Sequence, residues 1–167
     1  MATWYEFVEF GVSFYETAPF RIVAKTQINA APDHVFNTLK NEALWSRWLP
    51  AIQRVEWTSP KPIRVGSTRR IYTRHGRQLE EQCIRWVPER RASYMVLRGS
   101  MSRLLKAGTD FKITPNDQGC ELRWTIAIQP RGFVAQLGYL LRPGARIAVR
   151  AMLRRFKKVA EDPRSSR

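Results

Sequence analysis

Long apolar runs are missing from this sequence of 167 residues, because none approaches the roughly 20 residues that a helix needs to cross a bilayer. The stretch 1–17 carries Glu6, Glu9 and Glu16 where a secretory signal has a basic patch and an apolar core, and it has no small-residue cleavage site. We therefore predict a cytoplasmic protein. The hydrophobic fraction of 44% and the length are those of one globular domain.

Cysteine and histidine are also scarce. Cys83 and Cys120 both lie in strand-like stretches and not at the spacing of metal ligands, which favours two buried free thiols over the alternative of a disulfide. His34 and His75 stand alone, and the sequence contains no CxxC, HExxH or Ser/His/Asp pattern. We therefore predict no metal site and no cofactor, and the sequence identifies no catalytic residue.

Acidic residues are few relative to basic ones: 14 against 29, a formal net charge of +15. Such a surplus attracts anions, whether nucleic acid, an acidic lipid surface or a carboxylated ligand, and it does not determine the fold. Of the basic residues 22 are arginines, which favour planar, bidentate contacts with anions. A coding bias toward arginine would produce the same count, so composition leaves the partner open.

Hydrophobic periodicity predicts an α+β order of elements. An alternating stretch, residues 20–29, is typical of a strand, and helical spacing then predicts two short helices at about 32–40 and 42–48. The period returns to two and predicts further strands, with turns at His75-Gly76 and Asn116 to Gly119. These strands lie near 54–57, 67–74, 78–87, 92–98, 109–113 and 120–129.

The pattern after Pro130 is helical, and we expect Pro143-Gly144 to interrupt it before a longer helix at about 145–160. An antiparallel sheet of about six to seven strands has one apolar face that must be covered, and only this last helix is long enough to cover it. The prediction is a curved sheet, two short helices after the first strand, and a C-terminal helix that leaves a cavity against the sheet.

One domain is expected, at about 20–161. Residues 1–19 form an N-terminal extension, whose six aromatic residues suggest packing as an extra helix, an extended first strand or an arm. Residues 162–167 are expected to be a frayed tail.

Several segments carry a family resemblance in the same order along the chain. Ile28-Asn-Ala-Ala-Pro-Asp-His-Val-Phe36 leads into the first short helix, and Trp45-Ser-Arg-Trp48-Leu-Pro50 follows it. Val65 to Arg69 and the later hairpin segments Pro88 to Tyr94 and Gly119 to Trp124 complete the pattern. Together they resemble the START-like helix-grip superfamily (SRPBCC), in particular its polyketide cyclase/dehydrase-like branch. The resemblance implies a helix-grip fold that binds lipids, hormones, quinones or polyketides, and in some members catalyses cyclisation.

Candidate cavity residues are apolar side chains on the predicted strands and helices. As a group they would line a pocket for an apolar or amphipathic molecule, or they would simply form the core. One sequence does not show how the inward-facing positions of one strand relate to those of the next across a hairpin. Which of these side chains face the cavity therefore stays open. The candidates are Trp45, Trp48, Tyr72, Trp86, Tyr94, Phe111, Trp124, Leu137, Leu141 and Met152.

Two arginines on predicted strands, Arg69 and Arg123, are the polar candidates for the cavity, where paired donors would fix a ligand carboxylate or enolate. The alternative is the solvated face of the sheet. The final helix is basic, and its charged face is a candidate for docking on an anionic membrane. That face carries Arg146, Arg150, Arg154 and Lys157. Nucleic acid is the less favoured partner, because aromatic residues are not interleaved with these charges.

The function predicted from the sequence is therefore binding or transport of an apolar or amphipathic small molecule. A cyclase/dehydrase-type enzyme is the first alternative, resting on the resemblance alone. Peripheral binding to an anionic membrane or to nucleic acid is the second. The sequence contains no signal for the oligomeric state.

Overall fold

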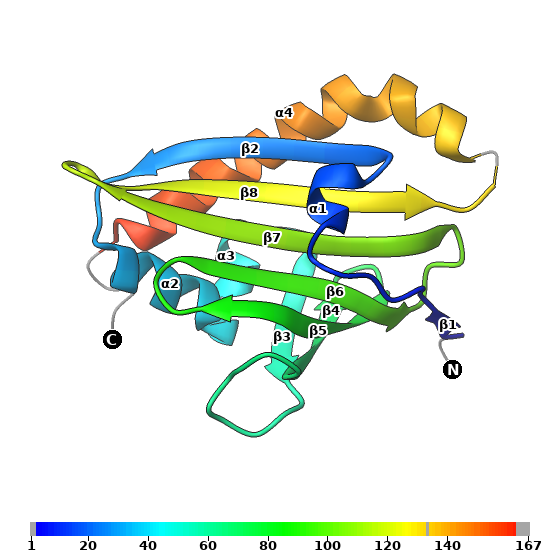
Figure 1. Cartoon of the computed structure of the whole chain (residues 1–167), viewed down its shortest axis with the longest axis horizontal. Helices are drawn as coiled ribbons and strands as arrows, with labels where there is room; N and C mark the ends of the chain where they lie inside the picture. The colour runs from blue at the N-terminus through cyan, green and yellow to red at the C-terminus, as the bar shows by residue number, and fades with distance from the viewer. Residues whose placement is uncertain (1–2, 133, 163–167) are drawn as a thin grey trace.

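The computed structural model describes residues 3–132 and 134–162, with the backbone alone for 134–142. Seven strands follow one another in an antiparallel sheet in the order β2-β8-β7-β6-β5-β4-β3, a two-residue strand pairs beside β6, and the sheet is curled into a half-barrel (Figure 1). This confirms the predicted fold class and strand number. The strands are β2 (Phe20–Ile28), β3 (Ile52–Trp57), β4 (Thr68–Thr73), β5 (Gln78–Val87), β6 (Arg91–Gly99), β7 (Leu104–Asn116) and β8 (Gly119–Pro130).

Two short helical segments follow β2, as predicted. Helix α2 (Pro32–Lys40) begins with proline at its first turn, where a missing N–H costs nothing. The second segment is a 3-10 turn, η1 (Glu42–Leu44), that runs directly into α3 (Trp45–Trp48). Asn41 caps the turn by accepting a hydrogen bond from Ala43 N at 3.0 Å.

Helix α4 (Val134–Ala160) crosses the sheet on the face opposite to the viewer in Figure 1 and ends beside α2. The predicted interruption at Pro143-Gly144 is wrong, because the helix is continuous and contains Pro143. A proline removes one intrahelical hydrogen bond, and packing of the C-terminal half of the helix on the core can offset that loss. The C-terminal half of α4 packs on the core through Val149, Leu153, Phe156 and Val159.

Strand parity divides the sheet into an inner face under α4 and an outer face. Leu122 and Trp124 on β8 are buried in the inner core, so the intervening Arg123 points outward and is exposed. The same alternation places Phe111 inside and Asp110 outside on β7.

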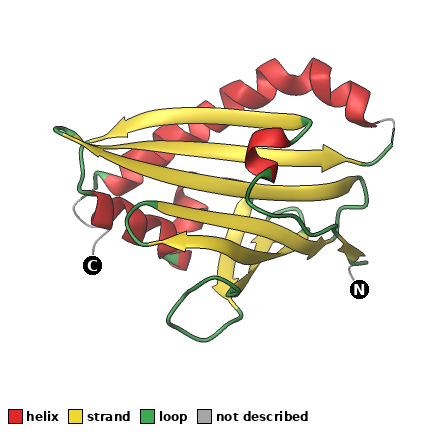
Figure 2. Cartoon of the chain, viewed as in Figure 1, coloured by secondary structure: helices red, strands yellow, loops and turns green. Residues whose placement is uncertain are grey.

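The outer face is partly covered by the N-terminal residues, which form a two-residue strand β1 (Tyr5–Glu6) and a one-turn helix α1 (Phe14–Thr17). Figure 2 shows α1 on the near side of the sheet and α4 on the far side. The pairing of β6 with β7 ends at Met95, and the chain inserts where the two strands part. Phe7 N donates to Leu97 O on β6, and Val8 N donates to Leu105 O on β7, both at 2.8 Å.

Both cysteines are buried and free, as predicted. Burial raises the pKa of the Cys83 thiol to about 11, and it also raises the pKa of Cys120.

Candidate functional site

A cleft of about 870 Å³ opens between α2, the loop that connects β3 to β4, and the turn between β5 and β6. Its volume lies in the range of small-molecule sites. Phe36 of α2 and Trp86 of β5 line it, with ring centroids 4.8 Å apart. Polar side chains surround this aromatic floor. They are Asp33, His34, Asn37, Thr38, Lys40, Asn41, Glu42, Lys61 and Glu89.

A chain of aromatic rings leads from this cleft into the interior. Trp86 contacts Trp57 at 6.5 Å between centroids, and Trp57 lies 6.2 Å from the ring of Tyr94. The guanidinium carbon of Arg69 lies 5.7 Å from the Trp57 ring. The cleft and Arg69 are therefore joined by consecutive ring contacts. Phe36 and Trp57 are not among the cavity candidates predicted from the sequence, although Trp57 shares strand parity with the apolar Val55.

Arg69 forms a buried ion pair with Glu81 across β4 and β5. Its Nε donates to Glu81 Oε2 at 2.8 Å, and Nη2 lies 2.7 Å from the same oxygen without the alignment of a hydrogen bond. The two residues are 1% and 4% exposed. The guanidinium carbon lies 3.6 Å from the centroid of Tyr94 and 4.2 Å from that of Trp45, so aromatic rings support the charge.

Several buried polar atoms on the inner face of the sheet, including atoms of Arg69 and Tyr94 themselves, have no hydrogen-bond partner among the described residues. Buried polar groups in proteins are normally bonded, so a group of unpaired ones marks a place where a ligand or water belongs. Burial raises the pKa of Tyr94, which keeps its hydroxyl protonated and able to donate. The atoms are Trp48 Nε1, Arg69 Nη1, Tyr94 Oη, Thr109 Oγ1 and Trp124 Nε1.

Most of the predicted aromatic candidates meet in one inner cluster. Trp48 is its centre, with ring centroids 5.1 Å from Trp45, 5.4 Å from Trp124 and 6.3 Å from Phe111. Phe156 of α4 lies 5.2 Å from Trp48. These rings occupy the space between the sheet and the C-terminal half of α4, and Met152 packs against them half-buried. The cleft lies to one side of this cluster, next to α2.

Two sequence candidates lie on the outer face instead of the inner one. Tyr72 alternates with the buried Ile71, and its ring stacks under the Arg54 guanidinium at 3.9 Å. Arg123 alternates with Leu122 and Trp124 and is exposed. The predicted cavity roles of Tyr72 and Arg123 are therefore wrong. The sequence alone does not show which strand positions face inward once the chain has passed through a hairpin. The side chains of Leu137 and Leu141 lie outside the described residues.

The predicted anionic-surface residues lie on the solvent side of α4. Arg146, Arg150 and Arg154 are exposed, and Ile147 beside them is 68% exposed. Lys157 differs, because it is half-buried and its Nζ lies 3.6 Å from the Glu161 carboxylate.

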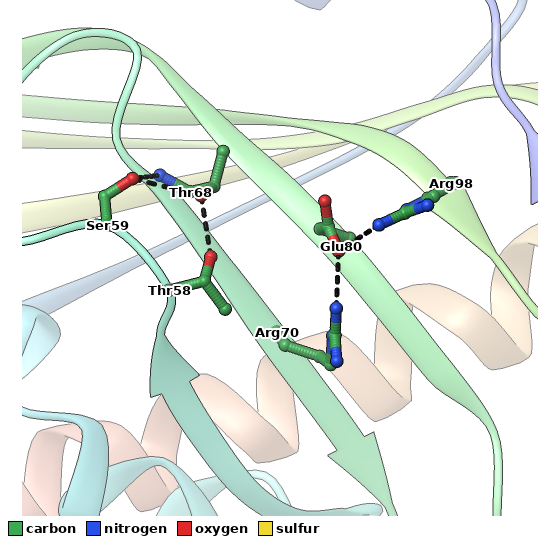
Figure 3. A network of polar contacts seen from close by, with 6 residues as sticks. All are labelled: Thr58, Ser59, Thr68, Arg70, Glu80 and Arg98. Carbon is green, nitrogen blue, oxygen red and sulfur yellow. Dashed lines mark hydrogen bonds and ion pairs between the residues drawn. The ribbon is translucent and has the colours of Figure 1, made fainter.

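An arginine neighbour of Arg69 belongs to a separate polar network (Figure 3). Arg70 and Arg98 each place Nη2 3.0 Å from Glu80 Oε2, and Figure 3 shows Glu80 between them. Burial alone would raise the pKa of Glu80, but the two guanidinium groups outweigh it and lower that pKa. The Trp4 ring lies 5.6 Å from Arg70 and 5.3 Å from Arg98, so the network also holds the N-terminal residues.

Three comparisons with known proteins bear on this geometry. A family model described as "Polyketide cyclase / dehydrase and lipid transport" matches residues 19–161. The chain belongs to this family. An uncharacterized protein of Mycobacterium tuberculosis (strain H37Rv) is 30% identical over 151 residues, which is 90% of each chain.

Solved structures share the fold at low sequence identity. A START superfamily protein from Mycobacterium smegmatis has a TM-score of 0.69 and 13% identity, over 84% of this chain and 97% of that one. The Zhui aromatase/cyclase of Streptomyces sp. R1128 has a TM-score of 0.68 and 14% identity, over 89% of this chain and 96% of that one. The START-like resemblance read from the sequence is thereby confirmed. In the described part of the chain, no helix is long and apolar enough to cross a membrane.

Proposed function

We propose that the protein binds a neutral, amphipathic small molecule that carries at least one carbonyl oxygen. The ligand enters at the cleft beside Phe36 and Trp86, and its oxygen reaches the donors around Arg69. The observation that carries this proposal is the buried Arg69–Glu81 pair with unpaired donors around it, at the inner end of a line of aromatic rings.

The charge of the site favours a neutral ligand. Glu81 already compensates the charge of Arg69, and both are removed from water. A second carboxylate brought to this place would be an uncompensated charge in the interior, which costs several kcal/mol, on the order of 3 or more. A carbonyl oxygen accepts hydrogen bonds without adding a charge.

The hydrogen-bonding character of the site favours an acceptor. Arg69 Nη1 and the indole nitrogens of Trp48 and Trp124 can only donate. The raised pKa of Tyr94 keeps its hydroxyl a donor. A ketone, quinone, ester or polyketide presents the acceptor oxygen that these donors lack. Such ligands agree with a family whose description names both cyclases and lipid transport.

Binding requires the aromatic rings between the cleft and Arg69 to move apart. Trp57 and Trp86 are half-buried, so they can turn toward the cleft with less loss of contact than a fully buried ring. These two side chains act as the gate between the cleft and Arg69.

A dye-displacement titration tests the proposal. The neutral dye N-phenyl-1-naphthylamine is bound first, and it is then displaced by 2-acetonaphthone or by 2-naphthoate, which share a ring system and differ in charge. We expect the ketone to displace the dye at a concentration about ten-fold or more below that of the carboxylate. Equal or better displacement by 2-naphthoate contradicts a neutral site.

Variants locate the binding. Trp86→Ala at the cleft and the double variant R69M/E81L, which replaces the ion pair by apolar side chains, should each weaken displacement by the ketone. Trp4→Ala, on the outer face, is the matched tryptophan control and should leave it unchanged. Far-ultraviolet circular dichroism verifies that each variant is folded.

A second function, docking of α4 on an anionic membrane, is supported by the exposed Ile147 among exposed arginines. An apolar residue flanked by Arg146 and Arg150 suits the boundary between headgroups and acyl chains. Cosedimentation with phosphatidylglycerol vesicles should decrease for I147E and decrease with added salt. Binding that ignores salt or I147E excludes this role for α4.

A further inference from the structure

A small pocket of about 120 Å³ lies on the outer face of the sheet, beneath the end of α1. It has no part in the ligand path, because the strand residues that line it point away from the inner core. Its charged lining residues are four basic and two acidic, a formal surplus of +2. They are Arg21, Arg91, Lys112, Arg123, Glu16 and Asp110.

The sheet register explains why basic residues gather there. Lys25 of β2 is paired with Arg123 of β8, Arg123 with Lys112 of β7, and Lys112 with Arg91 of β6. Four neighbouring strands thus present a basic residue at one level, each about 5 Å from the next. Like charges placed directly opposite one another destabilise a sheet, so this row has a cost that an anion would remove.

Two of these four charges are already compensated. Lys25 Nζ lies 3.0 Å from Glu121 Oε1, and Arg91 binds both oxygens of Asp110 at 2.9 and 3.0 Å. Asp110 also accepts a hydrogen bond from Ser93 at 2.6 Å, so its carboxylate is occupied.

The other two charges are free. Lys112 and Arg123 are exposed and form no ion pair within the described part of the chain. Arg21 donates to the backbone oxygens of Tyr15 and Glu16, at 3.4 and 2.8 Å, which fixes its guanidinium at the pocket rim. Adjacent, uncompensated cations of these two types bind a tetrahedral oxyanion well, since arginine supplies a fork of donors and lysine a point charge.

We propose that this outer-face pocket binds a phosphate group, either free or on a phosphomonoester lipid headgroup. A doubly charged phosphate matches the surplus of +2. The pocket has room for ordered water, which a phosphate can displace. The site lies on the opposite face of the sheet from the Arg69–Glu81 pair, so it is independent of the proposed ligand.

Amide chemical shifts measured on titration with inorganic phosphate test the pocket. We expect saturable shifts at Thr125, Asp110 and Lys112, and K112Q/R123Q should weaken binding about ten-fold or more. The matched control is R64Q/R77Q, which also removes two positive charges, from exposed loop positions, and should have little effect. Shifts that do not saturate, or an equal loss in both double variants, overturn the proposal in favour of general charge attraction.

Vesicles distinguish the two sources of phosphate. Phosphatidylcholine vesicles with and without phosphatidic acid are added to the protein, and cosedimentation is measured for the wild type, K112Q/R123Q and I147E. Retention that needs phosphatidic acid, is lost in K112Q/R123Q and persists in I147E assigns the pocket to a lipid headgroup. Saturable phosphate binding without such retention assigns it to a soluble phosphate. Neither kind of binding, in variants shown to be folded, refutes the site.

Discussion

At the scale of single residues, the Arg69–Glu81 pair is the feature that distinguishes the interior from an ordinary apolar core. Two charges are removed from water and depend on one another, and part of the guanidinium is left without a partner. A buried pair of this kind is seldom worth more to stability than apolar side chains of the same volume. Its presence is therefore better explained by binding than by stability.

Glu81→Gln should destabilise the protein by about 3 kcal/mol, because it leaves the buried charge of Arg69 uncompensated. Urea denaturation measures the effect. Glu121→Gln breaks the exposed pair with Lys25 and should cost about 1 kcal/mol or less. R69M/E81L should recover most of the stability lost in Glu81→Gln. A double variant that is less stable than Glu81→Gln would show that the pair itself holds the fold together.

In the sequence Arg69 and Arg123 are equivalent candidates, and only the fold separates them. Both are arginines on strands, but Arg69 faces the same side of the sheet as the buried Ile71. Arg123 faces the side opposite to the buried Trp124. Bulges in the pairing of β5 with β6 and of β3 with β4 break the simple alternation that a sequence can supply. The unpaired donors could not be predicted either, because they depend on contacts among several strands and α3.

At the scale of elements, turn residues and period two predicted each strand from β2 to β8, since both signals are local, but β7 (Leu104–Asn116) is much longer than the predicted 109–113. The N-terminal residues could not be predicted in the same way. Strand β1 has two residues and α1 has four, which is too short for either period to be read. The N-terminal residues are held by backbone hydrogen bonds to β6 and β7 beyond the point where the pairing of these two strands ends. This is a tertiary contact, which local sequence patterns do not show.

The turn between β7 and β8 depends on Gly119. It has a φ of +119°, and a Cβ there would lie 2.5 Å from Ile28 O and 2.8 Å from Ala30 N. Gly119→Ala should therefore destabilise the protein by about 2 kcal/mol or more, measured by urea denaturation. Gly144→Ala in α4 meets nothing within 4 Å and should be neutral or stabilising, by up to about 1 kcal/mol. Equal effects of the two substitutions would contradict the close approach at β2.

At the scale of the whole molecule, buried groups that are neutral at pH 7 make the fold sensitive to alkali. Burial raises the pKa of Cys83 from 9.0 to about 11, and burial also raises the pKa of Tyr15 and Tyr94. For a raised pKa, the folded state holds its proton while the unfolded state loses it. The stability that the Cys83 thiol contributes is therefore fully present below about pH 9 and is lost as the pH rises from about 9 to about 11.

This pH dependence is measured by urea denaturation at steps between pH 7 and 11. Cys83→Ala should flatten the curve between pH 9 and 11, because it removes one of the responsible groups. The contribution of the thiol is about 2 kcal/mol at the upper end of this window. The same slope in wild type and Cys83→Ala would show that the thiol contributes nothing.

The aromatic path from the cleft to Arg69 is tested most directly by the indole N–H resonances of the tryptophans, recorded while 2-acetonaphthone is added. Trp48 and Trp124 have unpaired Nε1 atoms in the interior, Trp86 lines the cleft, and Trp4 lies on the outer face. The proposal predicts a downfield shift of the Trp48 or Trp124 N–H on accepting a carbonyl oxygen, a shift of Trp86, and no change at Trp4. A response of Trp86 alone, or of no tryptophan under conditions where the ketone is bound, would contradict a ligand that reaches the interior.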